Sequence, residues 1–119
     1  MDVQNRKFDF EKLIVFQKTL ELMRLLKPLF NAPPRRAGKI CEDLDRSTQS
    51  TAFNIAEGAG RQPRSKDRTR FYNIALGSAK EAASQIIVLE IRGFISSKMY
   101  RSTRALLIEI VSMLTAMTK

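Results

Sequence analysis

The chain has 119 residues, of which 44% are hydrophobic, so it can fold around one core but is too short for two domains. It contains no histidine and a single cysteine, Cys41, which removes the most frequent acid–base catalyst and metal ligand and excludes an internal disulfide. Phosphate-loop and dinucleotide-binding motifs are also absent. We therefore expect a non-enzymatic protein without a metal or a cofactor. The lack of an apolar leader or membrane-spanning run predicts a cytoplasmic location and no membrane partner.

Four helices are predicted, and the first covers residues 9–30 after a flexible segment at residues 1–8. Apolar residues recur along it at three- and four-residue steps, which is the pattern of one buried helix face. These residues are Phe10, Leu13, Phe16, Leu20, Met23 or Leu22, and Leu26. We expect Asp9 to cap the first turn. Pro28 lacks an amide donor, so it should end the helix or kink it.

The second predicted helix covers residues 36–57, and its centre is rich in small hydroxyl residues. Serine and threonine let a neighbouring helix approach closely, and each hydroxyl can donate to the carbonyl four residues earlier. Gly58 is expected to end this helix as a cap with a left-handed backbone, a conformation that costs glycine nothing. Pro63 lies just beyond and opposes continuation of the helix. We interpret Cys41 as a small buried or semi-buried filler.

The third predicted helix covers residues 65–92, and the fourth covers residues 97–118. Ser65 is expected to be the N-cap of the third helix, and Ser96 or Ser97 that of the fourth. Small residues again dominate the centre of the third helix, so we expect it to pack tightly against the second. Long helices joined by short connections predict an all-α fold, an antiparallel up-and-down four-helix bundle.

Positive charge dominates the composition, with 21 Lys and Arg against 12 Asp and Glu, a formal net charge of +9 and a pI of about 10.2. Such an excess attracts polyanions, and clustered basic residues are typical of proteins that bind RNA or DNA. The candidate contact residues are Arg61, Arg64, Lys66, Arg68, Arg70, Arg35 and Arg36. Helical periodicity assigns the adjacent Phe71 to the core. We therefore expect phosphate contacts that tolerate sequence and weaken with salt, and little base stacking.

The basic residues also have a simpler interpretation. They could pair with neighbouring acids on a solvated loop, in which case the protein is a purely structural or protein-interaction assembly. Apolar side chains outside the main helical stripes would suit the interface of a homo-oligomer. These side chains are Val15, Leu25, Leu29, Ile87, Ile91 and Leu106.

A polar group is expected to join the second and third helices. Asn54 and Glu57 lie three residues apart on one helical face, and Glu81 falls on the third helix. We favour a buried structural network with Arg46, Arg61 or Arg70 as the counter-charge, because buried charges require partners. The alternative is a substrate site in which neighbouring carboxylates shift each other's pKa values, but no nucleophile or metal ligand accompanies them.

Residues 54–58 read Asn-Ile-Ala-Glu-Gly and resemble the signature of the 23S rRNA intervening-sequence protein family. Residues 71–78 with Glu81 match the second block of that family at the right separation, and residues 93–95 match the third. The resemblance extends over nearly the whole chain from Phe8 onward. Linked motifs at matching distances make it far more specific than one pentapeptide would be.

This resemblance implies a four-helix bundle that assembles into a ring, commonly a pentamer. A related group, the accessory variability determinants of diversity-generating retroelements, forms similar basic barrels that partner reverse transcriptase and nucleic acid. The expected partners are therefore further copies of the chain, together with RNA, DNA or a nucleic-acid-processing enzyme. Thr51 and Phe53 depart from the usual residues of the family, which bears on packing and assembly rather than on the fold.

Overall fold

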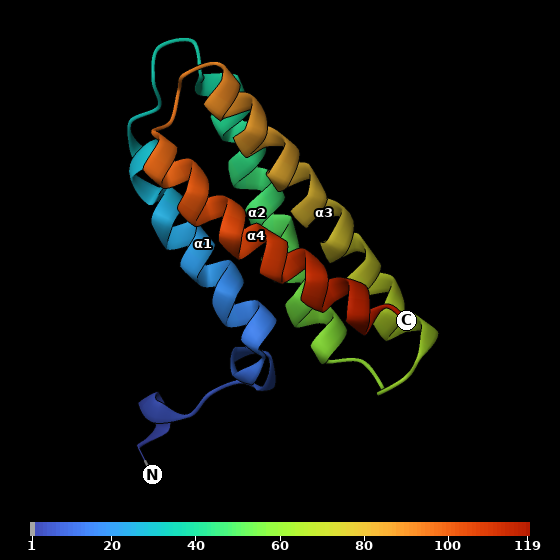
Figure 1. Ribbon diagram of the computed structural model, residues 1–119. Coiled ribbons are helices and arrows are strands. Elements are labelled where there is room, and N and C mark those ends of the chain that lie inside the picture. Colours follow the sequence, from blue (N-terminus) through green and yellow to red (C-terminus); the bar gives the residue numbers. More distant parts are fainter. Residues whose placement is uncertain (1) are drawn as a thin grey trace.

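The computed structural model describes residues 2–119, which form four long helices and two short 3₁₀ turns (Figure 1). The helices are α1 (Ile14–Asn31), α2 (Gly38–Ala59), α3 (Lys66–Ile91) and α4 (Ser97–Met117), and the turns are η1 (Val3–Asn5) and η2 (Asp9–Lys12). This part of the chain contains no strand, which confirms the all-α prediction. None of these helices has the length and apolar character needed to cross a membrane. The predicted flexible segment includes Met1, which lies outside the described residues.

The helices form the predicted four-helix bundle. Each helix packs against two neighbours, α1 on α2, α2 on α3, α3 on α4 and α4 on α1, and the contact between α2 and α3 is the most extensive. The α1–α2 and α3–α4 connections lie at one end of the bundle (Figure 1). The α2–α3 connection lies at the opposite end, together with the start of α1 and the C-terminus. We call this second end the α2–α3 end.

The start of α1 differs from the prediction. The chain is extended at Leu13, with φ −74° and ψ 127°, so α1 begins at Ile14 rather than at residue 9. The predicted cap at Asp9 was wrong, because Asp9 belongs to the separate turn η2. That turn is stabilised locally, since the Phe8 amide donates a hydrogen bond to the Glu11 carboxylate at 2.9 Å.

Pro28 lies inside α1, which continues to Asn31. Of the two outcomes expected at this proline, an early end of the helix does not occur. A proline removes one amide from the hydrogen-bond ladder. Leu26 and Leu29 on either side are buried in the core, and their packing holds the last turns in place despite that loss.

Gly58 lies within α2 and does not end it. The helix continues past it, and Gly60 is the C-cap. Among residues 2–119 the only glycine with a positive φ is Gly93, at 74°, so the predicted left-handed cap at Gly58 was wrong. Gly58 is buried against the next helix, where a Cβ atom would lie 2.6 Å from Cε1 of Tyr72. The glycine is therefore required by the close approach of α2 and α3.

Small residues bring α2 and α3 together, in agreement with the prediction. The fully buried alanines of α3 are Ala75, Ala79 and Ala82. On α2, Thr51 Oγ1 donates to the carbonyl of Ser47 at 2.8 Å, so this hydroxyl is satisfied inside the core. Cys41 is 3% exposed, and burial raises the pKa of its thiol. Its interpretation as a buried filler is confirmed.

The six apolar side chains predicted for a subunit interface divide into three groups, of which the half-buried Ile87 forms one by itself. Val15, Leu29 and Leu106 are buried in the core, so their assignment to an interface was wrong. Each helix packs against two neighbours, and its buried face is therefore wider than one stripe. Leu25 and Ile91 are exposed. Further exposed apolar side chains are Ile14, Phe53, Ile74, Val88 and Ile108.

Candidate nucleic-acid interface

Ser65 begins α3 as its N-cap, which confirms the prediction. Its extended backbone, with φ −81° and ψ 154°, turns the chain into the helix. Its Oγ atom accepts a hydrogen bond from the Arg68 amide at 3.0 Å, one of the amides that the first turn leaves without a partner. Asp67 adds a negative charge to the same turn, where the helix dipole favours it.

The side chain of Arg68 donates hydrogen bonds to the backbone of the α2–α3 connection. Its Nη2 atom donates to the carbonyls of Ala59 at 2.9 Å and Arg61 at 2.7 Å, and its Nε atom donates to the Arg61 carbonyl at 3.1 Å. These carbonyls lie where α2 ends and have no helical amide to accept from. The guanidinium of Arg68 therefore stabilises the connection, whereas the sequence predicted either a phosphate contact or an ion pair for it.

Arg61 and Arg70 are held by neighbouring acids and by an aromatic ring. Arg61 pairs with Glu57 at 3.1 Å and with Asp67 at 3.5 Å, while Arg70 pairs with Asp67 at 3.0 Å. Their guanidinium carbons lie 4.7 and 4.5 Å from the ring centroid of Phe71. Phe71 is only half-buried, so its assignment to the core was wrong. The cations over its ring favour this position at the surface.

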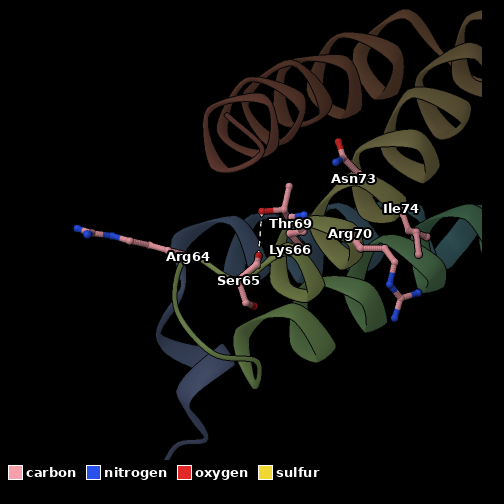
Figure 2. A pocket seen from close by; sticks show the side chains of 7 residues that line it. All are labelled: Arg64, Ser65, Lys66, Thr69, Arg70, Asn73 and Ile74. Carbon is pink, nitrogen blue, oxygen red and sulfur yellow. Dashed lines mark hydrogen bonds between the residues drawn. The ribbon is translucent and has the colours of Figure 1, made fainter.

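Arg64 and Lys66 are exposed, and neither forms an ion pair within residues 2–119. Arg64 has a left-handed backbone with φ 62°, and Figure 2 shows its side chain extending away from α3. Both residues line a hollow of about 580 Å³ at the start of α3. The other lining residues are Ser65, Thr69, Arg70, Asn73 and Ile74. The hollow thus combines two uncompensated cations with the end of a helix that attracts anions.

Arg35 and Arg36 do not join this cluster. They lie in the α1–α2 connection, at the end of the bundle opposite to the α2–α3 end (Figure 1). Arg36 also has a left-handed backbone, with φ 72°. The seven candidate contact residues therefore do not lie on one surface, because an up-and-down bundle places successive connections at alternate ends.

The predicted buried network of charged residues does not form. Glu57, Glu81 and Arg46 are all exposed. Arg46 forms an ion pair with Asp43 on its own helix. The pKa of Asp43 is lowered, first by a hydrogen bond from Lys39 and further by the charge of Arg46. Partners three or four residues away in the sequence satisfy these groups at the surface. Within residues 2–119 no cluster of acidic or cysteine side chains is placed to hold a metal ion.

Hydroxyl groups join the two helices instead. The Oγ atoms of Ser50 on α2 and Ser78 on α3 lie 2.7 Å apart in a hydrogen bond. Asn54 Nδ2 donates to the carbonyl of Ser50 at 2.8 Å and contacts its Oγ atom at 3.3 Å. Asn54 is therefore the one member of the predicted network that supports the contact between α2 and α3. The positions of Ser50 and Asn54, four residues apart on one face, were the signal in the sequence.

Phe10 and Phe16 belong to the predicted apolar face, but the sequence did not predict the exposed Phe8 that stacks on Phe10 at the α2–α3 end. Phe8 is 69% exposed and stacks on Phe10, with ring centroids 5.4 Å apart and ring planes 5° from parallel. Phe10 meets Phe16 of α1 edge-on at 5.0 Å. Turn η2, which carries Phe10, packs against α1 and α2. Phe10 also lines a hollow of about 360 Å³ with Ala56, Glu57, Gly60 and Arg61. The spacing of the phenylalanines in residues 8–16 was the available signal.

Comparisons with known proteins agree with this fold. The model of the family described as 23S rRNA-intervening sequence protein matches residues 11–116. The chain is also similar to the crystal structure of a protein of unknown function from the S23 ribosomal protein family of Bacteroides thetaiotaomicron. The two chains are 27% identical with a TM-score of 0.79, over 89% of this chain and 99% of the other. None of the curated proteins compared with the sequence matches it.

Proposed function

Because the chain belongs to the 23S rRNA-intervening sequence protein family, we propose that it is a non-enzymatic, cytoplasmic, homo-oligomeric scaffold whose α2–α3 end binds the phosphates of RNA or DNA. The observation that carries this proposal is the position of Arg64 and Lys66, two exposed cations without acidic partners in residues 2–119, at the start of α3. The net charge of +9 adds a long-range attraction for polyanions.

The other arginines of the α2–α3 end contribute less to this site. Arg61 and Arg70 would have to share their acidic partners with a phosphate, and Arg68 is held by backbone carbonyls. Arg64 and Lys66 can reach a phosphate without breaking an ion pair, so neutralising them removes contacts directly. Such contacts release counterions, carry no sequence information and weaken as salt rises.

Two double variants of equal charge test the site. Arg64→Ala with Lys66→Ala and Arg35→Ala with Arg36→Ala remove the same two positive charges from opposite ends of the bundle. Binding to a fluorescent oligouridylate of about 20 nucleotides is measured by anisotropy between about 50 and 300 mM salt. We expect the first variant to bind more weakly and to lower the slope of log affinity against log salt by about 1.4, the value for two single-strand phosphate contacts.

The control variant should bind like the wild type after correction for net charge. Equal weakening in both variants would mean that overall charge and no local site accounts for binding. Absence of binding by the wild type to single-stranded and duplex RNA at low salt would refute the proposal. The protein would then be a structural or protein-interaction assembly, and a partner that survives nuclease treatment in a pull-down would identify it as such.

The assembly is supported by apolar side chains that the single chain leaves exposed, among them Ile74 and Ile91 on α3 and Ile108 on α4. The family resemblance implies a pentamer, with a mass of about 68 kDa, five times the 13.6 kDa of one chain. Light scattering coupled to size-exclusion chromatography measures this mass directly. A mass of one chain at micromolar concentration would remove the oligomer from the proposal.

A further inference from the structure

Phe8 presents one open face of an ordered aromatic ring at the α2–α3 end. Its other face is covered by Phe10, which in turn rests against Phe16 in the core. The ring is therefore oriented by an aromatic ladder that is anchored in the bundle. An isolated exposed phenylalanine lacks this support and contributes less to the free energy of binding, because its side chain loses conformational entropy when the ligand orders it.

Exposed cations adjoin this ladder, next to the acids Asp9 and Glu11 of turn η2, and the Glu11 carboxylate accepts a hydrogen bond from the Phe8 amide. Arg6 and Lys7 directly precede Phe8 and are exposed. Phe10 lines the same hollow as Arg61, which belongs to the basic cluster of the α2–α3 connection. Glu57 lines this hollow as well, but its carboxylate is paired with Arg61 at 3.1 Å. An open aromatic face beside cations is the combination with which proteins bind single-stranded nucleic acid.

We propose that Phe8 is a stacking platform for an unpaired base, so that the α2–α3 end binds single-stranded in preference to duplex nucleic acid. This inference rests on the proposed function and adds the class of ligand to it. A base that stacks on the open face extends the row formed by Phe10 and Phe8. Bases inside a duplex are covered by their neighbours on both faces and cannot make this contact.

The test compares Phe8→Ala with Val3→Ala, because Val3 is a similarly exposed apolar residue (71% exposed) of the same segment that has no aromatic partner. Affinities are measured for an oligouridylate of about 20 nucleotides and for an RNA duplex of the same length. We expect Phe8→Ala to weaken binding of the single strand by about 5- to 100-fold and to leave duplex binding unchanged. Val3→Ala should change neither affinity. Circular dichroism checks that both variants retain the fold.

A tryptophan in place of Phe8 provides a second and direct measurement. The chain contains no tryptophan, so the variant Phe8→Trp carries a single fluorescent reporter at the proposed platform. Stacking of a base should quench its emission, and the variant should retain the affinity of the wild type for the single strand. Addition of the duplex should leave the emission unchanged.

The outcomes separate this inference from the proposed function. Loss of binding in Arg64→Ala with Lys66→Ala, together with unchanged single-strand binding in Phe8→Ala and unquenched emission from Phe8→Trp, would overturn the platform and leave the phosphate site intact. Equal weakening of single-strand and duplex binding in Phe8→Ala would also overturn it. If Phe8→Ala leaves RNA binding unchanged but disrupts the oligomer, the ring is an anchor for protein contact and the inference is wrong.

Discussion

Replacing Gly58 by alanine tests the explanation given for the tight contact between α2 and α3. The added Cβ atom would lie 2.6 Å from Cε1 and 2.8 Å from Cδ1 of Tyr72, and 3.3 Å from Cβ of Phe71. Non-bonded carbon atoms do not come as close as 2.6 or 2.8 Å, so either the Tyr72 ring or the backbone at residue 58 would have to move. Tyr72 is 4% exposed, so its ring is enclosed by other side chains and has little room to move.

The expected loss of stability follows from two opposing terms. Overpacking a close-packed position costs about 1–3 kcal/mol. Alanine recovers helix propensity of at most about 1 kcal/mol, and less in the last turn of a helix, where Gly58 lies. We expect a net loss of about 1–2 kcal/mol in the free energy of unfolding, which lowers the melting temperature by roughly 4–8 °C for a domain of this size.

Gly77→Ala is the matched control. Gly77 lies in the interior of α3, and a Cβ atom added there would meet no other atom within 4 Å. The substitution should raise stability by about 0.5–1 kcal/mol, because alanine has the higher helix propensity and meets no steric resistance. Thermal and urea unfolding followed by circular dichroism give both values, and the two variants should change stability with opposite signs.

A stabilising effect of Gly58→Ala equal to that of Gly77→Ala would refute the reasoning, since it would mean that Tyr72 yields without cost. A double-mutant cycle with Tyr72→Leu adds a second criterion. Removal of the ring should abolish most of the penalty at Gly58 and give a coupling energy of about 1 kcal/mol or more. Additive effects of the two substitutions would place the origin of the penalty elsewhere.

Two further substitutions distinguish structural from surface charges. Arg68→Ala should lower the free energy of unfolding by about 1–2 kcal/mol, because it leaves the carbonyls of Ala59 and Arg61 without their donor; a change below about 0.3 kcal/mol would contradict this role. Glu57→Ala should change the melting temperature by less than roughly 2 °C, because Glu57 forms its ion pair with Arg61 at the surface, where the two side chains are 59% and 42% exposed, respectively. A larger drop would contradict the assignment of this pair to the surface.

The sequence predicts the four helices well because their apolar periodicity is long and regular. It fails at boundaries that depend on contacts outside the helix. Asp9 has the chemistry of an N-cap, yet the chain at this point forms a separate turn in which Glu11 binds the Phe8 amide. Gly58 has the chemistry of a C-cap, yet a glycine is required here because Tyr72 of the next helix leaves no room for a Cβ atom. Neither contact can be inferred from one helix alone.

At the candidate site, too, contacts within one helix could be predicted from the sequence, whereas contacts that depend on the connection could not. Ion pairs between residues three or four apart, such as Asp67 with Arg70, follow from helical spacing. The contact of Arg68 with the carbonyl of Ala59 crosses nine residues and depends on the path of the connection. The prediction that Glu57 is buried in a polar network was wrong for a different reason. A shift of one residue along a helix turns the side chain by about 100° around the axis. Glu57 therefore lies at the surface next to the buried Gly58.

The contact between α2 and α3 links the stability of the bundle to the proposed interface. Gly58 lies in the last turn of α2 and Ser65 caps α3, so the spacing of the two helices sets the distance that the connection between them must span. Arg68 then fixes the path of this connection by binding its backbone. Arg64 and Lys66 stand on either side of the cap, and their positions follow from the same constraints. The Asn-Ile-Ala-Glu-Gly motif thus bears on the proposed function through geometry, because the packing of Gly58 against Tyr72 helps to set where the two cations lie.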